Sequence, residues 1–316
     1  MKIIISDPIG FEDEHIAMMV DSASGDTVVA PSEDELVKEM ADAEVFFGYH
    51  SPEIFVSAPN LKWIQTTSAG LDAILTPEVV ERGLLVSNAS GLHAAPVVET
   101  AWALTLAVAR GLKTFQQDQK DHVWNPFGPM DVNGRTAGIV GLGGIGRRYA
   151  RIAAAFGMRV IAVDRHSPPK PDEVESLWGL ERLNDLVAES DVLMIACPAT
   201  VETQGLIGPE QLALMKPTAI LVNIARGGIV DEPALIESLK NGRIAGAGLD
   251  VMKTEPLPAD DPLWDTPGLI LTPHIAGLST DRSRRVVEFF CENLRRYKRG
   301  EELQNLVDQS CGYPVP

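Results

Sequence analysis

The sequence of 316 residues is poor in cysteine and in positive charge. The three cysteines, Cys197, Cys291 and Cys311, show no Cys-x-x-Cys spacing, which argues against a disulfide framework and against a zinc cluster. Only 27 basic residues stand against 44 acidic ones, which gives a formal net charge of −17. Nucleic acids and anionic membranes bind to basic patches, so we expect neither as a partner.

Long hydrophobic runs are also missing from this chain. A membrane-spanning helix needs about 18 apolar residues in a row, and no run in this sequence is that long. The apolar stretch near the N-terminus is too short for the core of a signal peptide and resembles a first β-strand. Without an export signal, the three thiols are expected to stay reduced, and we predict a cytoplasmic protein.

Strand-like and helix-like segments alternate along the chain, which is typical of an α/β fold with parallel sheets. Helical patterns cover 33–41, 96–117 and 281–299, and the second of these is expected to weaken at Gly111. The predicted strands are 2–6, 27–30, 45–49, 63–66, 85–87, 137–140, 159–163, 192–196, 219–223, 245–250 and 269–271.

The length of the chain favours two domains over a single core. The six strands from residue 137 onward predict a Rossmann dinucleotide-binding domain over 98–282. Residues 1–97 together with 283–316 are expected to form a smaller, discontinuous, flavodoxin-like α/β substrate domain.

The most informative motif is Thr-Ala-Gly-Ile-Val-Gly-Leu-Gly-Gly-Ile-Gly at 136–146, a short strand that runs into Gly-x-Gly-x-x-Gly and a helix. Gly141 permits a tight turn, Gly143 lets the backbone approach a pyrophosphate, and Gly146 lets strand and helix pack closely. The phosphates would bind the free N–H groups at the start of the helix. Asp164, at the end of the next strand, would accept hydrogen bonds from the adenosine ribose.

Asp164 also bears on the choice between NAD and NADP. Its carboxylate would repel a 2′-phosphate, so NAD is the first choice. Arg165 and His166 follow directly, and an arginine at this place can accommodate the phosphate, so NADP stays possible. No metal-ligand cluster is seen, and hydride transfer to a carbonyl polarised by His and Arg does not require a metal.

Polar residues follow three later strands, at the sheet edge where open α/β folds bind ligands. These segments are Leu-Val-Asn-Ile-Ala-Arg-Gly-Gly-Ile-Val-Asp at 221–231, Gly-Leu-Asp-Val-Met-Lys-Thr-Glu-Pro at 248–256 and Leu-Thr-Pro-His-Ile-Ala-Gly at 271–277. Ser-Ala-Gly-Leu-Asp at 68–72 and His-Ala-Ala-Pro-Val-Val-Glu at 93–99 complete the pattern. Together with the glycine motif, they resemble the D-isomer-specific 2-hydroxyacid dehydrogenase family over nearly the whole chain.

The resemblance implies an Arg–Glu–His active site at Arg226, Glu255 and His274. His274 would protonate the carbonyl oxygen of a 2-oxo acid, or accept the proton in reverse, and imidazole suits this because it titrates near neutrality. Glu255 would orient the imidazole and favour its protonated form. Arg226 would bind the substrate carboxylate or carbonyl through its planar fork of donors. Taken alone, each of these residues also allows a structural reading, as a strand-end His, a surface acid or a turn cap.

Further contacts follow from the same resemblance. Asp250 would bind the nicotinamide carboxamide, although a turn-capping role is the alternative, and His50 either lines the substrate cleft or is structural. Ser68, Ala69 and Gly70, whose backbone N–H groups would hold the carboxylate, complete the substrate site with Arg226 and His274. The implied cofactor-binding residues are Gly141, Gly143, Gly144, Ile145, Gly146, Asp164, Arg165, Cys197, Ile224, Ala225, Asp250 and Gly277.

The resemblance therefore implies an NAD(P)-dependent oxidoreductase that interconverts small 2-oxo acids and D-2-hydroxy acids, of the glyoxylate or hydroxypyruvate reductase type. Phosphite dehydrogenase and short-form phosphoglycerate dehydrogenase remain alternatives, as does a non-enzymatic NAD(H) sensor that binds partner proteins. Formate dehydrogenases are disfavoured because they carry Gln where Glu255 stands. The apolar helix over 96–117 is expected to contribute to a homodimer interface.

Overall fold

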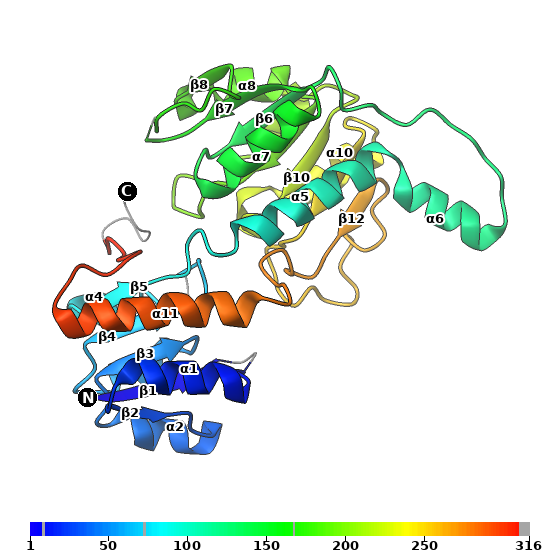
Figure 1. Cartoon of the computed structure of the whole chain (residues 1–316). Coiled ribbons are helices and arrows are strands. Elements are labelled where there is room, and N and C mark those ends of the chain that lie inside the picture. Colours follow the sequence, from blue (N-terminus) through cyan, green and yellow to red (C-terminus); the bar gives the residue numbers. More distant parts are fainter. Residues whose placement is uncertain (8–9, 72–73, 167, 310–316) are drawn as a thin grey trace. The chain divides into compact units, whose positions relative to one another are not determined.

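The computed structural model describes residues 1–7, 10–71, 74–166 and 168–309 (Figure 1). The chain forms two compact units, Met1–His93 with Ser279–Pro316, and Ala94–Leu278. At both points this division falls four residues before the predicted domain boundaries, at 93 rather than 97 and at 278 rather than 282. The first unit's part in substrate binding remains a prediction. Asp72 and Cys311, which the sequence reading included, lie outside the described residues.

The first unit contains a parallel five-stranded sheet in the order β2-β1-β3-β4-β5. This is the flavodoxin-like order, and its strands fall where the sequence predicted them. The strands are β1 (Lys2–Ser6), β2 (Thr27–Val29), β3 (Val45–Gly48), β4 (Trp63–Thr66) and β5 (Leu85–Ser87). The helices are α1 (Asp13–Ala23), α2 (Glu33–Met40), α3 (Pro52–Val56), α4 (Pro77–Glu81) and α11 (Arg282–Arg299).

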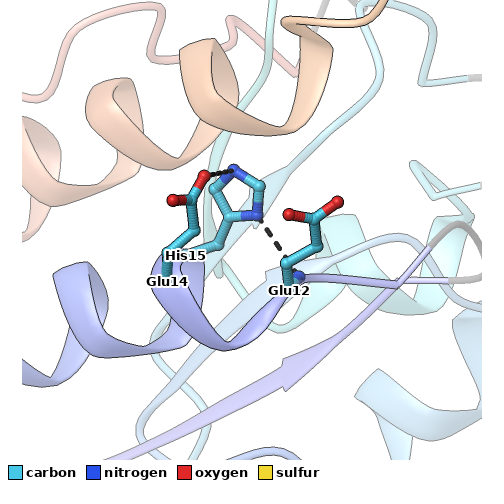
Figure 2. Close-up of side chains that lie close together, drawn as sticks. All are labelled: Glu12, Glu14 and His15. Atoms are coloured by element: carbon cyan, nitrogen blue, oxygen red, sulfur yellow. Dashed lines mark hydrogen bonds and ion pairs between the residues drawn. The ribbon is translucent and has the colours of Figure 1, made fainter.

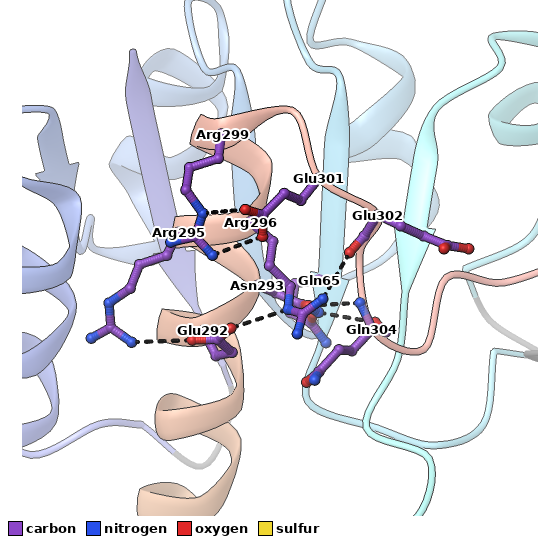
Figure 3. A network of polar contacts seen from close by, with 9 residues as sticks. All are labelled: Gln65, Glu292, Asn293, Arg295, Arg296, Arg299, Glu301, Glu302 and Gln304. Carbon is purple, nitrogen blue, oxygen red and sulfur yellow. Dashed lines mark hydrogen bonds and ion pairs between the residues drawn. The ribbon is translucent and has the colours of Figure 1, made fainter.

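Helix α11 is held on the first unit by an aromatic stack and a buried amide. The Phe290 ring lies 4.2 Å from that of Phe47 and 5.7 Å from that of Trp63, between centroids. The fully buried Asn293 donates to Gln65 Oε1 at 2.9 Å and accepts the Gln304 N–H at 2.8 Å (Figure 3). These contacts return the far end of the sequence to the N-terminal sheet, as the prediction of a discontinuous unit requires.

The second unit contains a parallel seven-stranded sheet in the order β12-β11-β10-β9-β6-β7-β8. Counted from β6, this is the Rossmann order with one strand added beyond the sixth. The strands are β6 (Thr136–Val140), β7 (Arg159–Val163), β8 (Ser176–Trp178), β9 (Val192–Ile195), β10 (Ile220–Asn223), β11 (Gly246–Leu249) and β12 (Leu269–Leu271). The α-helices are α5 (Ala94–Ala109), α6 (Leu112–Asp121), α7 (Gly144–Ala155), α8 (Leu183–Glu189), α9 (Pro209–Leu214) and α10 (Glu232–Lys240), and short 3-10 turns cover Leu180–Arg182 and Gly227–Ile229.

Two predictions for this unit need correction. The sequence reading gave six strands and missed β8, an edge strand of three half-buried residues that include no β-branched side chain. The single helix predicted over 96–117 is two helices, because Gly111 adopts a left-handed φ of 67° between α5 and α6. Among the described residues, no helix combines the length and the apolar character that crossing a membrane requires.

Candidate active site

The three predicted catalytic residues follow three neighbouring strands of the second unit. Strands β10, β11 and β12 pair in parallel, so their carboxyl ends meet at one edge of the sheet. Arg226 follows β10, Glu255 follows β11 and His274 follows β12. The topology therefore brings segments separated by up to 48 residues, 226 to 274, to the place where ligands bind in such sheets.

His274 and Glu255 form a direct pair. His274 Nδ1 lies 2.6 Å from Glu255 Oε2, and the other oxygen, Oε1, accepts the Met252 N–H at 2.9 Å. Each carboxylate oxygen thus has its own partner, which fixes the plane of the carboxylate. The His274 side chain is 47% exposed. One ring nitrogen is oriented by an acid and the other is left to face a reactant, which is the arrangement that general acid–base catalysis needs.

The segment that carries His274 is fastened by Asp250, which is fully buried. Asp250 Oδ1 accepts the Ile275 N–H at 3.0 Å and the Thr272 hydroxyl at 2.5 Å, and Oδ2 accepts the Ala276 N–H at 2.9 Å. His274 itself has a left-handed φ of 53°. The structure therefore gives Asp250 the turn-capping role that was the alternative, and its predicted contact with the nicotinamide carboxamide remains a prediction.

Arg226 is presented by a turn that Asn223 shapes. The buried Asn223 side chain donates to the Arg226 carbonyl at 2.9 Å and accepts the Ala225 N–H at 3.0 Å. The Arg226 guanidinium is half-buried and donates to the Ala225 carbonyl at 2.7 Å. The sequence reading did not single out Asn223, although a polar residue at the last position of a fully buried strand is a signal that could have found it.

The glycine motif forms the tight turn that the sequence predicted. Gly141 has a φ of 96°, and a Cβ there would lie 2.8 Å from the Cys197 backbone. A Cβ on Gly146 would lie 2.1 Å from the Gly141 carbonyl oxygen. By contrast, no atom lies within 4 Å of a Cβ built on Gly143 or on Gly144.

Helix α7 begins beside that open space. Gly143 is its N-cap, no side chain caps it, and Gly144, Ile145 and Gly146 form its first turn. First-turn N–H groups have no partner within a helix and favour anions. A pyrophosphate would fit here, because the turn has space for it and offers N–H groups, so these residues suit a dinucleotide.

Asp164 stands at the end of β7, next to this turn. Its Oδ2 accepts the Leu142 N–H at 2.7 Å and its Oδ1 accepts the His166 N–H at 2.9 Å. A carboxylate oxygen has a second lone pair, so ribose hydroxyls can still be bound. Arg165 lies 3.1 Å from Glu202, between Nη1 and Oε1, in a pair that is more than half exposed.

Cys197 is buried against the glycine turn. Burial raises the pKa of its thiol to about 12, so the thiol is neutral at physiological pH. A thiolate is needed for nucleophilic or redox chemistry, and Cys197 is therefore a packing residue at this position. Ile224 and Ala225 are also buried, at the end of β10, and Gly277 is half-buried three residues beyond His274. Cofactor contacts of these four residues remain predictions.

The predicted substrate loop lies in the first unit. Ser68 Oγ accepts the Gly70 N–H at 3.2 Å, and the Ala69 carbonyl accepts the Asn88 amide at 2.7 Å. The Gly70 N–H is thus engaged, which makes the Ala69 N–H the better candidate for binding a carboxylate. His50 pairs with Glu33 at 3.1 Å and accepts the Ser51 N–H at 2.8 Å, which favours its structural reading.

Glu12, Glu14 and His15 form one group of possible metal ligands within the described residues (Figure 2). His15 Nδ1 accepts the Glu12 N–H at 3.3 Å and its Nε2 lies 3.7 Å from Glu14 Oε1. The histidine therefore forms a capping box with the N-cap residue Glu12, and Glu14 belongs to the exposed first turn of α1. Such a group is the ordinary outcome of helix capping and gives no reason to assign a metal.

Comparison with known proteins identifies related sequences. Residues 102–276 match the family model described as "D-isomer specific 2-hydroxyacid dehydrogenase, NAD binding domain". A protein named glyoxylate reductase from Korarchaeum cryptofilum is 39% identical over 291 residues, which cover 88% of this chain and 87% of that protein. A D-3-phosphoglycerate dehydrogenase from Methanocaldococcus jannaschii is 33% identical over 98% of this chain and 59% of its own length.

Solved structures agree with this relationship. A D-isomer specific 2-hydroxyacid dehydrogenase from Xanthobacter autotrophicus, in complex with NADPH and MES, is 29% identical with a TM-score of 0.86 and covers 99% of both chains. An NADPH-dependent glyoxylate/hydroxypyruvate reductase from Sinorhizobium meliloti, in complex with NADP and sulfate, is 25% identical with a TM-score of 0.87, again over 99% of both chains.

Proposed function

Because the chain belongs to the D-isomer-specific 2-hydroxyacid dehydrogenase family, we propose that it reduces glyoxylate or hydroxypyruvate, with His274 as the proton donor. It is an NAD(P)-dependent oxidoreductase of small 2-oxo and 2-hydroxy acids. The choice of these two substrates is supported by relatives at about 39% identity that are named glyoxylate reductase and by the glyoxylate/hydroxypyruvate reductase structure.

The observation that carries the proposal is the His274–Glu255 pair beside the Arg226 turn. When bound, NAD(P)H supplies the hydride that the carbonyl carbon of the substrate accepts. His274 Nε2–H gives its proton to the carbonyl oxygen, while Nδ1–H stays bonded to Glu255 and the carboxylate stabilises the imidazolium before transfer. Arg226 binds the substrate carboxylate and so fixes which atom faces His274.

The cofactor would be held by the turn between β6 and α7, with the adenosine ribose at Asp164. We propose NAD as the preferred form, because Asp164 places a negative charge where a 2′-phosphate would lie. Glu202 supports this proposal, since it engages Arg165, the arginine next to Asp164 that could otherwise neutralise that phosphate. One similar structure contains NADPH and another contains NADP, so NADP is the alternative cofactor.

A substrate and cofactor panel tests the proposed function. The purified protein is assayed for oxidation of NADH and of NADPH with glyoxylate, hydroxypyruvate, pyruvate, phenylpyruvate and 2-oxoisocaproate. We expect the fastest turnover with glyoxylate or hydroxypyruvate and a higher kcat/KM with NADH than with NADPH. Preferential turnover of another acid would overturn the substrate assignment. Tight NADH binding without any turnover would favour phosphite, phosphoglycerate or a sensor role.

The homodimer interface was predicted over 96–117, but much of α5 is buried, whereas α6 is not. We further propose that two copies of the chain pair through α6 and residues 122–133. None of the residues of α6 is buried, and Figure 1 shows that this arm projects from its unit. Leu112, Phe127 and Trp124 on the arm are 47%, 42% and 95% exposed. A ten-residue helix is not stable by itself, so an uncovered helix followed by a segment with exposed aromatic side chains indicates a partner surface.

The oligomeric state tests this second proposal. Sedimentation of the wild-type protein should give a dimer, and Trp124→Glu should shift the equilibrium toward monomer. Val37→Glu, at a position 62% exposed on α2, is the matched control and should stay dimeric. A monomeric wild-type protein would overturn the proposal. We also propose a cytoplasmic location, on the argument that the thiols stay reduced. The two cysteines within the described residues, Cys197 and Cys291, are buried.

A further inference from the structure

We propose that Glu232 is a positioning residue for the proton-transfer pair, because its carboxylate holds the turn that carries Glu255. The inference rests on the proposed function and assigns a role to a residue outside the Arg226–Glu255–His274 set. Glu232 opens helix α10, directly after the segment that carries Arg226. Glu232 is therefore close in sequence to Arg226, while its side chain contacts the segment that carries Glu255.

The contact that carries the inference joins Glu232 to the backbone of residue 253. Lys253 N–H donates to Glu232 Oε1 at 2.6 Å. The preceding N–H, that of Met252, donates to Glu255 Oε1 at 2.9 Å. Two consecutive N–H groups of one turn thus bind two different glutamates, one from the turn itself and one from α10. Loss of the Glu232 contact leaves the Glu255 turn held on one side only.

The backbone segment after Arg226 also packs closely against the backbone of the Glu255 turn. A Cβ on Gly227 would lie 1.9 Å from the Met252 carbonyl carbon and 2.2 Å from the Lys253 nitrogen. The backbone next to Arg226 therefore touches the backbone that begins the Glu255 turn. Glu232, five residues after Gly227, binds the same Lys253 backbone through its carboxylate. Arg226 and Glu255 are fixed relative to each other by these two contacts.

The charges around Glu232 make its hydrogen bond to the Lys253 N–H important for keeping its carboxylate ionised. Glu232 is half-buried, and burial raises its pKa, which the Lys253 N–H partly offsets. The charged groups that face it are Asp261 and Glu255, which raise the pKa further, and Lys253, which lowers it. A second acid so close to Glu255 is costly unless it bonds to the turn, so its presence here indicates a positioning role.

Three variants test the role. Glu232→Ala removes the acceptor, Glu232→Gln keeps an oxygen acceptor without the charge, and Glu237→Ala, on the exposed side of the same helix, is the matched control. Glu232→Ala should lower kcat about tenfold with KM for the 2-oxo acid changed less than twofold. Glu232→Gln should recover most of the loss, and Glu237→Ala should match the wild type. NADH affinity should be unchanged in all three.

A second readout does not need turnover, so it separates this inference from the proposed function. Titration of the His274 imidazole by NMR, assigned by comparison with His274→Asn, should show its midpoint at lower pH in Glu232→Ala, because a loosely held Glu255 stabilises the imidazolium less. If Glu232→Ala fails to fold, Glu232→Asp moves the acceptor back by one methylene and should show the same changes in smaller degree. An unchanged midpoint, or a Glu232→Gln variant as slow as Glu232→Ala, would overturn the inference.

Discussion

His274 Nδ1 and Glu255 Oε2 lie 2.6 Å apart, on segments that follow two neighbouring strands. The distance is that of a strong charge-assisted hydrogen bond, and the second carboxylate oxygen is bound to the Met252 N–H. The pair orients the imidazole for proton transfer.

Replacing Glu255 by Gln should therefore shift the pH profile. Reduction needs the protonated imidazole, and the carboxylate favours that form. Without the negative charge the imidazolium loses a stabilising partner, so the fall of the reduction rate at high pH should begin at lower pH. The rate in the oxidation direction, which needs the neutral imidazole, should rise at lower pH as well. Profiles of kcat/KM in both directions check this, and a profile that does not move would contradict the assigned role.

His274→Asn should lower kcat for reduction by about 10³-fold, which is the usual effect of removing a general acid. The left-handed backbone of residue 274 suits asparagine, so the fold should be preserved. Fluorescence titration should give an NADH affinity within about twofold of the wild type, because the proposed role of His274 is to protonate the substrate and not to bind the dinucleotide. A large loss of NADH binding would mean that His274 is assigned to the wrong task.

Asp164→Ala tests the ribose contact and the cofactor preference together. The variant should bind NADH about tenfold more weakly, since a hydrogen bond to a charged acceptor is lost. Binding of NADPH should change less, because repulsion of its 2′-phosphate is removed at the same time. Asp172→Ala, at an exposed acid of the same unit, is the control. Equal losses for the two cofactors would remove the ribose role from Asp164.

Two glycine substitutions should separate a structural from a binding effect. Gly141→Ala forces a side chain into a φ of 96° and to 2.8 Å from the Cys197 backbone, so it should destabilise the protein by about 2 kcal/mol. Gly143→Ala meets no protein atom within 4 Å and should leave the melting temperature unchanged while it weakens NADH binding. Thermal denaturation and NADH titration distinguish the two. A stable Gly141→Ala variant that binds NADH normally would contradict the turn geometry.

The thiol of Cys197 should be inert in the folded protein. With its pKa raised to about 12, about one thiol in 10⁴ is ionised at pH 8, and the side chain is buried as well. Iodoacetamide at that pH should modify Cys197 only after denaturation, as mass spectrometry of peptides would show. Rapid modification of the native protein would mean that the segment after β9 opens far more often than its packing indicates.

The sequence predicted most strands but missed one strand and underestimated one helix break. Strands β3 and β4 were predicted because fully buried parallel strands are short apolar runs with clear boundaries. The partly exposed edge strand β2 was predicted because Thr27, Val28 and Val29 are all β-branched. Strand β8 was missed because its residues, Ser176–Trp178, are half-buried and include no β-branched side chain. The break at Gly111 was expected only as a weakening, since glycine permits a left-handed φ without requiring it.

The sequence by itself determined the residues on which the proposed chemistry depends: the glycines of the turn between β6 and α7, Asp164 after β7, and Arg226, Glu255 and His274 after successive strands. These are local patterns, and each depends on residues close together in the chain. Only the tertiary structure decided which groups meet. It joined Glu255 to His274, turned both oxygens of Asp250 toward the His274 segment, and set Glu232 against Lys253. Pairing of this kind depends on strand order and on distances between remote segments, which the sequence pattern of a single segment does not contain.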